Sequence, residues 1–312
     1  MSRKNSNAMK APRKARSPAP GRGGVGRLVH GDSFAFAFET KKALGQHFLK
    51  DESVIARIAH EAQASLPVGM PRDVVEIGPG SGVLTKALLA DGWKVVAVEK
   101  DERAAQGLKE SLAEAHASTL SIVNEDILRW SPADAPKGGL CAGNLPYYIT
   151  SDILFWFLAH ARDFAAALFM IQDEVADRLS AKPGTKDYGR LTVRMQLSCT
   201  VEKLMFVPAS AFVPPPKVNS AVVRLTPLPS PFADAAEEKR FGEFTALLFS
   251  ARRKMLRRAL AAQLGDIQAR EGGEAALSTF WQKASVFGIR EDTRPDAISP
   301  AGILGLFKLV RG

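Results

Sequence analysis

Asp73-Val-Val-Glu-Ile-Gly-Pro-Gly-Ser-Gly82 is the most informative stretch of this sequence. A short apolar strand is predicted at Asp73–Gly78, a glycine-rich turn follows it, and the spacing of Val83, Leu84, Ala87 and Leu88 then predicts a helix. A buried strand that enters a helix through such a turn is typical of an open parallel sheet, which binds ligands beyond the carboxyl ends of its strands. No Gly-Lys-Ser/Thr triplet closes the turn, so this is not a phosphate-binding P-loop.

The alternation of strands and helices continues on both sides of this stretch. A helix is predicted at Glu52–Leu66, and further helices begin at Asp101 and near Ser151. Short apolar strands are predicted at Lys94–Glu99, Leu120–Asp126, Gly139–Ala142 and Ala165–Ile171. This pattern predicts an α/β fold, a Rossmann-like parallel sheet with helices on both faces. Two later strands, Thr200–Phe206 and Ser220–Leu225, are expected to form an antiparallel hairpin at the sheet edge.

The chain divides into three predicted regions. Residues 1–38 are rich in Arg, Lys, Pro and Gly and nearly lack acidic residues, so we expect a disordered basic tail. Residues 39–226 contain the predicted sheet and end in the proline-rich linker Thr226–Pro231. Residues 227–312 show only helical patterns, with a long or broken helix at Glu237–Leu264 and another at Pro300–Val310, which predicts a small all-α domain.

Charge and composition restrict the partners and the compartment. The net charge of +9 and the clustering of the basic residues favour nucleic acid as the partner. Cys141 and Cys199 show neither metal-binding nor disulfide spacing, which favours a reducing compartment, and both are expected in the core. No apolar run approaches the roughly 20 residues of a membrane span, and the first 30 residues lack a secretory signal. We therefore expect a cytoplasmic protein without membrane contact or metal, and a monomer because no large exposed apolar stripe is evident.

Acidic residues end the two strands that follow the glycine turn. Glu99 lies about twenty residues beyond the turn, where a carboxylate accepts hydrogen bonds from two ribose hydroxyls. Asp126 ends the next strand and could accept a hydrogen bond from an adenine amino group. The pattern favours a nucleoside that lies across the sheet. By itself it does not separate a nicotinamide cofactor from S-adenosylmethionine.

The fourth strand ends in Asn144-Leu-Pro-Tyr147, which suits chemistry on an exocyclic adenine amine. Such an amine is a poor nucleophile because its lone pair is delocalised into the ring. The Asn144 amide oxygen and the Leu145 carbonyl can each accept one N–H bond and so orient the lone pair. Pro146 stiffens the turn, and Tyr147 offers a stacking face for the base.

Nine motifs in this order resemble the ribosomal RNA adenine dimethyltransferases, specifically their bacterial small-subunit branch. The resemblance covers roughly residues 41–310, and its motifs are Leu44-Gly-Gln-His-Phe-Leu49, Glu76-Ile-Gly-Pro-Gly80, Val98-Glu99, Asn124-Glu-Asp126, Gly143-Asn-Leu-Pro-Tyr147, Gln172-Asp-Glu-Val-Ala176, Tyr188-Gly-Arg-Leu191, Phe212-Val-Pro-Pro-Pro-Lys-Val-Asn-Ser220 and Arg252-Arg-Lys-Met-Leu256. Each motif alone is weak, whereas nine in the right order are specific.

The resemblance implies an S-adenosylmethionine-dependent enzyme that dimethylates adenine N6 in 16S ribosomal RNA within the small ribosomal subunit, at two adjacent adenines late in assembly. It implies that Phe212 stacks on the target adenine opposite Tyr147, and that Glu76 reaches the cofactor's amino group. The cofactor pocket that it implies consists of His47, Leu49, Gly78, Gly80, Glu99, Asp126 and Asn144. One departure is Tyr148, where many relatives carry Asn; because it follows the amine-accepting motif, we expect activity to persist.

RNA binding is expected from basic residues that contact phosphates. The candidates are Arg252, Arg253, Lys254, Arg257 and Arg258, together with Lys41, Lys42 and the tail, and the alternative for these residues is a solvated helix face. Four other functions stay open. They are an Erm-type methyltransferase of large-subunit RNA, a DNA adenine N6-methyltransferase, a non-catalytic ribosome-assembly factor and, least favoured, a nicotinamide dehydrogenase.

Overall fold

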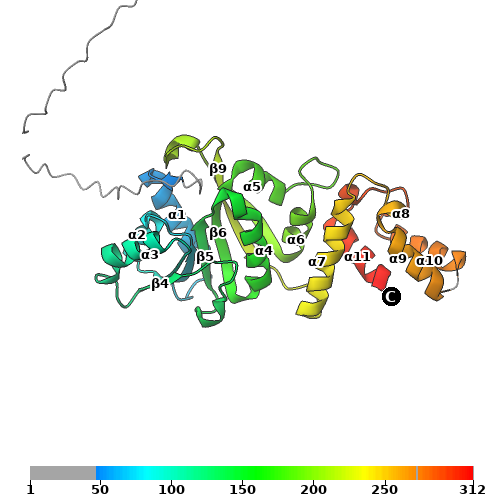
Figure 1. Ribbon diagram of the computed structural model, residues 1–312, viewed down its shortest axis with the longest axis horizontal. Coiled ribbons are helices and arrows are strands. Elements are labelled where there is room, and N and C mark those ends of the chain that lie inside the picture. Colours follow the sequence, from blue (N-terminus) through cyan, green and yellow to red (C-terminus); the bar gives the residue numbers. More distant parts are fainter. Residues whose placement is uncertain (1–46, 272, 312) are drawn as a thin grey trace, which may run out of the picture. The chain divides into compact units, whose positions relative to one another are not determined.

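The structure, a computed structural model, describes residues 47–271 and 273–311 (Figure 1). The predicted basic tail, Lys41 and Lys42 lie outside the described residues, and so do the first three residues of the motif at Leu44–Leu49. The expectations for these segments therefore stay predictions.

A seven-stranded sheet forms the centre of the described chain, in the order β4-β3-β2-β5-β6-β9-β7. The first five strands in this order pair in parallel, whereas β9 pairs antiparallel with both β6 and β7. The strands are β2 (Asp73–Ile77), β3 (Lys94–Glu99), β4 (Leu120–Asn124), β5 (Gly139–Asn144), β6 (Phe164–Gln172), β7 (Cys199–Val207) and β9 (Ser220–Pro227). The predicted α/β fold and its antiparallel edge hairpin are confirmed.

Helices cover both faces of the sheet (Figure 1). One face packs against α1 (Glu52–Ala64), α2 (Val83–Ala90) and α3 (Glu102–Leu108), and the other against α4 (Thr150–His160), α5 (Asp173–Leu179) and α6 (Arg190–Ser198). Successive residues of a strand point to opposite faces. In β2, accordingly, Val74 belongs to the core of the first face and Val75 to the core of the second, and both are 2% exposed.

A short two-stranded ladder lies outside the main sheet. It pairs β1 (Phe48–Leu49) antiparallel with β8 (Phe212–Val213). With two residues in each strand, neither shows a detectable period in the sequence, and the ladder was not predicted. It ties the chain that follows His47 to a segment more than 160 residues later.

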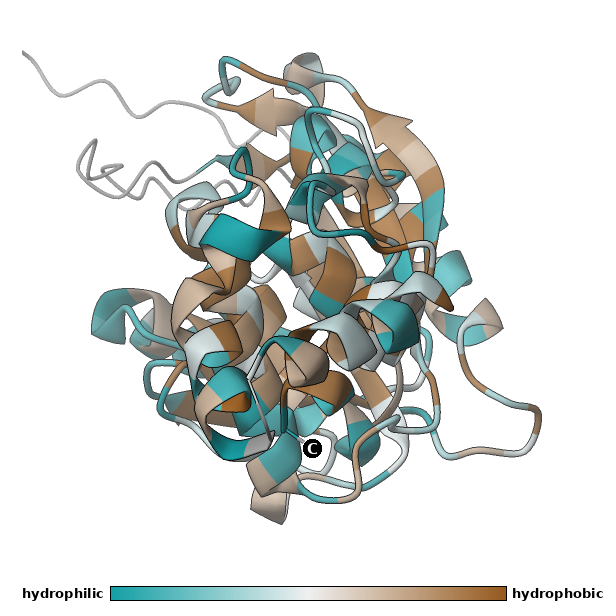
Figure 2. Cartoon of the chain, turned by 90° about the vertical axis from the view of Figure 1, so that its right-hand side faces the viewer, coloured by the Kyte–Doolittle hydropathy of each residue, from teal (hydrophilic) through white to brown (hydrophobic). Residues whose placement is uncertain are grey.

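The remaining chain is helical and shares a third core with α6. Tyr188 and Val193 from the region of α6 pack with Phe241 and Phe307 of the later helices, and the Tyr188 hydroxyl donates to the Ile298 carbonyl at 2.7 Å. Along these helices hydrophilic and hydrophobic residues are interspersed (Figure 2), as expected for helices with one buried face. They are α7 (Ala235–Ser250), α8 (Leu256–Ala259), α9 (Ala261–Glu271), α10 (Glu274–Ser285) and α11 (Pro300–Arg311).

The helix predicted at Glu237–Leu264 as long or broken is broken, between Ser250 and Leu256. At the break the backbone N–H of Leu256 donates to the Thr293 carbonyl at 2.8 Å, and the Leu256 side chain is buried. A tertiary hydrogen bond and burial thus replace helix continuity here. No helix in the described part of the chain is long and apolar enough to cross a membrane.

Candidate active site

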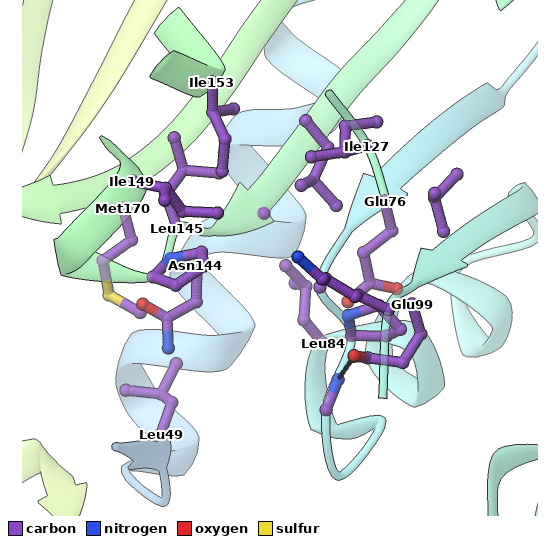
Figure 3. Close-up of a pocket in the computed structure, with 18 of the residues that line it drawn as sticks. Leu49, Glu76, Leu84, Glu99, Ile127, Asn144, Leu145, Ile149, Ile153 and Met170 are labelled. Atoms are coloured by element: carbon purple, nitrogen blue, oxygen red, sulfur yellow. Dashed lines mark hydrogen bonds between the residues drawn. The ribbon is translucent and has the colours of Figure 1, made fainter. Parts of the chain in front are cut away.

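A cavity of about 490 Å³ opens at the carboxyl ends of β2, β3 and β5. Glu76 and Glu99 lie on one side of it, and Asn144, Leu145 and Met170 lie on the other (Figure 3). The predicted site residues that line it are His47, Leu49, Glu76, Gly78, Gly80, Glu99, Asp126, Asn144, Leu145, Pro146 and Tyr147. The fold thus brings together every predicted cofactor residue and all but one of the predicted catalytic residues.

The glycine turn needs backbone conformations that side chains resist. Gly78 and Gly80 have φ values of +62° and +56°, and a Cβ at Gly80 would lie 3.3 Å from the Phe48 ring. Apart from Gly78 and its two chain neighbours, no atom of the described residues lies within 4 Å of a Cβ built at Gly78. Because glycine has no Cβ, both residues adopt the left-handed backbone conformation without a steric clash. The space beside Gly78 also stays open.

Glu99 closes the turn from the end of β3. Its Oε2 accepts the Gly80 backbone N–H at 3.1 Å, and its Oε1 accepts that of Asp101 at 2.8 Å. Burial raises the pKa of Glu99, while these two hydrogen bonds lower it. An ionised carboxylate has about four acceptor positions. Each Glu99 oxygen therefore keeps one position for a ligand hydroxyl.

Glu76 lies deeper in the pocket and is 1% exposed. Its Oε2 accepts the Thr85 hydroxyl at 2.7 Å. Burial raises the pKa of Glu76 to about 7, and the charge of Glu99 adds to the effect. A cationic group close to Glu76 would favour its ionised form, which suits the predicted role toward an amino group.

Asp126 is held by two hydrogen bonds just beyond β4. The Lys100 ammonium donates to its Oδ2 at 2.7 Å, and the Leu128 backbone N–H donates to its Oδ1 at 3.0 Å. The hydrogen bond from Lys100 is the largest factor that lowers the pKa of Asp126. Asp126 is therefore a fixed anion at the pocket wall, with further acceptor capacity on each oxygen.

Asn144 and Leu145 present acceptors after β5. The Asn144 Nδ2 donates to the His47 carbonyl at 3.3 Å, which leaves its Oδ1 available. The Leu145 backbone N–H donates to the Met170 carbonyl at 3.0 Å and fixes that peptide. Within the described residues the Leu145 carbonyl oxygen accepts no hydrogen bond. Two carbonyl-type oxygens thus stand free at one loop.

Tyr147 and His47 form an aromatic wall beside this loop. Their ring centroids are 5.8 Å apart and the rings are tilted by 32°. The Tyr147 hydroxyl lies 2.7 Å from the Ser220 hydroxyl, and His47 Nδ1 lies 2.8 Å from the Pro214 carbonyl. Because a carbonyl only accepts, Nδ1 carries the proton. Both rings are therefore oriented by polar contacts at their edges.

Phe212 is not brought to the pocket. Its side chain is 1% exposed and packs in the core with Leu49 and Val207. Its predicted role, stacking on a base opposite Tyr147, stays a prediction that requires the ring to leave this position. Its strand β8 still supports the site, because Phe212 pairs with Leu49 in the β1–β8 ladder.

Several lining residues were missed by the sequence reasoning. Lys100 and Ile127 each directly follow a predicted acidic residue, so adjacency to a strand end could have found them. Leu168 and Met170 of β6 carried no such signal, because their position depends on the strand order. No cluster of His, Cys, Asp and Glu suited to a metal occurs in the described part of the chain.

Of the basic residues proposed for RNA, Arg252 has a structural contact. Its guanidinium donates to the Lys186 carbonyl at 3.0 Å and lies 3.8 Å from Asp296. Arg253, Lys254, Arg257 and Arg258 are exposed, and none of them forms an ion pair with a described residue. These four side chains are therefore available to contact phosphates.

Comparison with known proteins agrees with this geometry. A profile of the family "Ribosomal RNA adenine dimethylase" matches residues 37–273. The chain is 40% identical to "Ribosomal RNA small subunit methyltransferase A" of Bacillus cytotoxicus over 74% of this chain and 80% of the relative. For the protein of the same name from Bacillus mycoides the identity is 39%, over 73% of this chain and 79% of the relative.

Two solved structures are also similar. A dimethyladenosine transferase from Plasmodium falciparum is 27% identical and superposes with a TM-score of 0.67 over 83% of this chain and 96% of that one. The 23S rRNA methyltransferase ErmE is 30% identical, with a TM-score of 0.59 over 85% of this chain and 100% of that one. With its profile match, its curated relatives and its class I methyltransferase fold, the chain belongs to the ribosomal RNA adenine dimethylase family.

Proposed function

We propose that this enzyme transfers methyl groups from S-adenosylmethionine to N6 of adenines in 16S ribosomal RNA and produces N6,N6-dimethyladenosine, at two adjacent adenines late in small-subunit assembly. The observation that carries this proposal is the loop after β5, where the Asn144 amide oxygen and the Leu145 carbonyl are both free acceptors at the pocket. We further propose that it acts as a monomer in the cytoplasm, where small subunits assemble.

The pocket residues fit S-adenosylmethionine. Glu99 keeps acceptor positions for the ribose hydroxyls, and Asp126 keeps them for the adenine amine. Ile127 and Leu145 supply apolar walls, and buried Glu76 offers a negative charge to an amino group. When bound, S-adenosylmethionine supplies an electrophilic methyl group on a sulfonium.

The chain's own residues orient the nucleophile. The Asn144 Oδ1 and the Leu145 carbonyl each accept one N–H of the adenine amine and so direct its lone pair toward the methyl group. Pro146 holds the loop rigid, and the Tyr147 ring packs on the base. Positioning of this kind supplies several kcal/mol of a barrier. The alkylated amine loses a proton to water, and the monomethylated amine keeps one N–H for a second round.

One finding favours the small subunit over an Erm-type activity on large-subunit RNA. The curated relatives at about 40% identity carry small-subunit names. The target base must leave its stack or be single-stranded already, because the amine must reach a pocket within the protein.

The test offers labelled S-adenosylmethionine with three substrates in parallel: small subunits that lack the modification, large-subunit RNA and adenine-containing DNA. We expect label in the small-subunit RNA alone. Label in large-subunit RNA alone would favour the Erm-type activity. Cofactor binding without transfer to any of the three would favour a non-catalytic assembly factor.

A further inference from the structure

The mouth of the pocket carries an aromatic side chain that the proposed chemistry leaves unused. Tyr148 lines the pocket and is 61% exposed, in the short turn Tyr147–Ile149 that precedes α4. Its hydroxyl makes no hydrogen bond to the described residues, whereas that of Tyr147 is 2.7 Å from Ser220. A ring this exposed adds little to the core, so its face is available to a ligand.

Lys100 lines the same pocket as Tyr148, and the backbone N–H of Arg129 donates to the Asp126 carbonyl at 2.8 Å in the turn that follows. Lys100 pairs with Asp126 at 2.7 Å, and its side chain stays 65% exposed. The hydrogen bond and charge of Asp126 raise the pKa of Lys100 most, Tyr148 adds to the rise, and Arg129 opposes it. Arg129 itself is exposed and forms no ion pair with a described residue.

Aromatic faces flanked by cations are the usual means of binding single-stranded nucleic acid. Successive bases stack on the rings while basic side chains follow the phosphates, and every base can take part because each has a stacking face. Here the ring belongs to the residue after Tyr147, on which the target base packs in the proposed reaction. Neighbouring Cα atoms are about 3.8 Å apart. The backbone of Tyr148 thus lies next to that of Tyr147, and its exposed ring lines the same pocket.

We propose that Tyr148, with Lys100 and Arg129, forms a platform for the nucleotide adjacent to the target adenine. The base of that nucleotide stacks on Tyr148, and its phosphates contact Lys100 and Arg129. The platform holds the strand open beside the pocket and favours a purine, which has the larger face, next to the target. This inference rests on the proposed function, because the platform is used only if single-stranded RNA enters the pocket.

The experiment uses the full chain and an RNA hairpin whose loop contains adjacent adenines. In separate RNAs, 2-aminopurine replaces the base on either side of one adenine, since its fluorescence falls when it stacks. The variants are Tyr148→Ala, Tyr148→Phe and, as a matched control, Phe206→Ala. Phe206 is a 54% exposed aromatic residue on β7 that does not line the pocket.

At saturating protein we expect quenching at one of the two positions with the wild type, Tyr148→Phe and Phe206→Ala, and loss of quenching with Tyr148→Ala. In steady-state assays, Tyr148→Ala should raise the KM for small subunits about 5- to 10-fold. This change corresponds to the lower end of the binding energy of one base–aromatic stacking contact. Its kcat and its affinity for S-adenosylmethionine should change by less than about twofold, because the proposed contact of the ring is with the neighbouring nucleotide.

Equal quenching with Tyr148→Ala and the wild type would overturn the platform. A weaker affinity for S-adenosylmethionine with an unchanged KM for subunits would also overturn it and place Tyr148 in the cofactor wall. Fluorescence does not depend on methyl transfer. If the proposed function is wrong, the wild type will transfer no methyl group. If only the platform is wrong, the wild type will transfer methyl groups normally, and Tyr148→Ala will quench the fluorescence as the wild type does.

Discussion

The side-chain amide of Asn144 donates to the backbone carbonyl of His47 at 3.3 Å, across 97 residues of sequence. Because that carbonyl only accepts, the NH₂ end of the amide must face it, and the oxygen end must face away. The contact thus fixes Asn144 as an acceptor toward the pocket before any ligand arrives. It also makes the backbone of His47, the first described residue, part of the geometry of this loop.

Replacement of Asn144 by Ala should reduce kcat by at least about 100-fold, comparable to the loss of one preorganised polar group at a reacting centre. Folding and the affinity for S-adenosylmethionine should change less, because the amide is only partly buried and Leu145 keeps its backbone bond to Met170. Single-turnover kinetics and thermal unfolding measure the two effects separately. A variant with near wild-type kcat would show that Asn144 does not orient the amine.

Substitution by Ala should affect stability differently at two glycines of the same turn, Gly82 and Gly78. A Cβ at Gly82 would lie 2.5 Å from Leu108 Cδ2 at a φ of +74°, so Gly82→Ala should destabilise the fold by roughly 1–3 kcal/mol. At Gly78 a Cβ meets no atom of the described residues beyond its chain neighbours within 4 Å, so only the left-handed strain of about 1 kcal/mol applies.

Since Gly78 lines the pocket, Gly78→Ala should weaken cofactor binding more than it lowers the unfolding free energy. Urea unfolding and calorimetric titration of each variant with S-adenosylmethionine measure this contrast. Parallel losses of stability and affinity in both variants would refute the distinction between a packing glycine and a ligand glycine.

Glu76 should make stability depend on pH. Its pKa of about 7 lies above the usual 4.5, so the folded state binds this proton more tightly than the unfolded state does. The contribution of Glu76 to the unfolding free energy is greatest below pH 4.5, falls as the pH rises to about 7 and stays constant at higher pH. Glu76→Gln cannot ionise, so its unfolding free energy relative to the wild type should rise across this window, by on the order of 3 kcal/mol at about 1.4 kcal/mol per pKa unit.

Denaturant unfolding of both proteins without ligand at pH 5 and pH 8 tests the effect. Gln keeps an acceptor for the Thr85 hydroxyl, so the local hydrogen bond is preserved. A stability difference that is identical at the two pH values would mean that Glu76 titrates normally.

Small-subunit binding should depend on salt through the exposed basic residues after α7. The double variant Arg253→Ala/Lys254→Ala should bind more weakly, and the slope of log affinity against log salt should become shallower by roughly 0.7–0.9 for each lost phosphate contact. Lys239→Ala/Arg240→Ala removes the same charge from exposed positions within α7 and serves as the matched control. Equal slopes for both double variants would assign the effect to net charge alone.

The parallel sheet was predictable because its strands are short apolar runs that alternate with helical patterns. Lys94–Glu99 was predicted with its observed bounds, and Asp73–Gly78 differs from β2 by one residue. A helix was predicted to begin at Asp101, and the Asp101 Oδ1 does cap it by accepting the Arg103 backbone N–H at 2.9 Å. Local rules sufficed at these positions because local contacts determine the structure there.

Tertiary contacts determine what the sequence left open. The β1–β8 ladder depends on a pairing between Leu49 and Phe212 that no local pattern encodes. The break before Leu256 depends on a backbone bond to Thr293. Lys100 is an ordinary surface cation in sequence, and its contact with Asp126 exists because β3 and β4 are parallel neighbours.

Dimethylation of adenine N6 in small-subunit RNA is tested most directly by nucleoside analysis of that RNA after incubation with this enzyme and S-adenosylmethionine. The subunits come from a strain that lacks the modification, and Asn144→Ala is the matched control. We predict N6,N6-dimethyladenosine at adjacent adenines with the wild type and very little of it with Asn144→Ala. Absence of dimethyladenosine from the wild-type reaction, while S-adenosylmethionine binding is measured in the same preparation, would contradict this prediction.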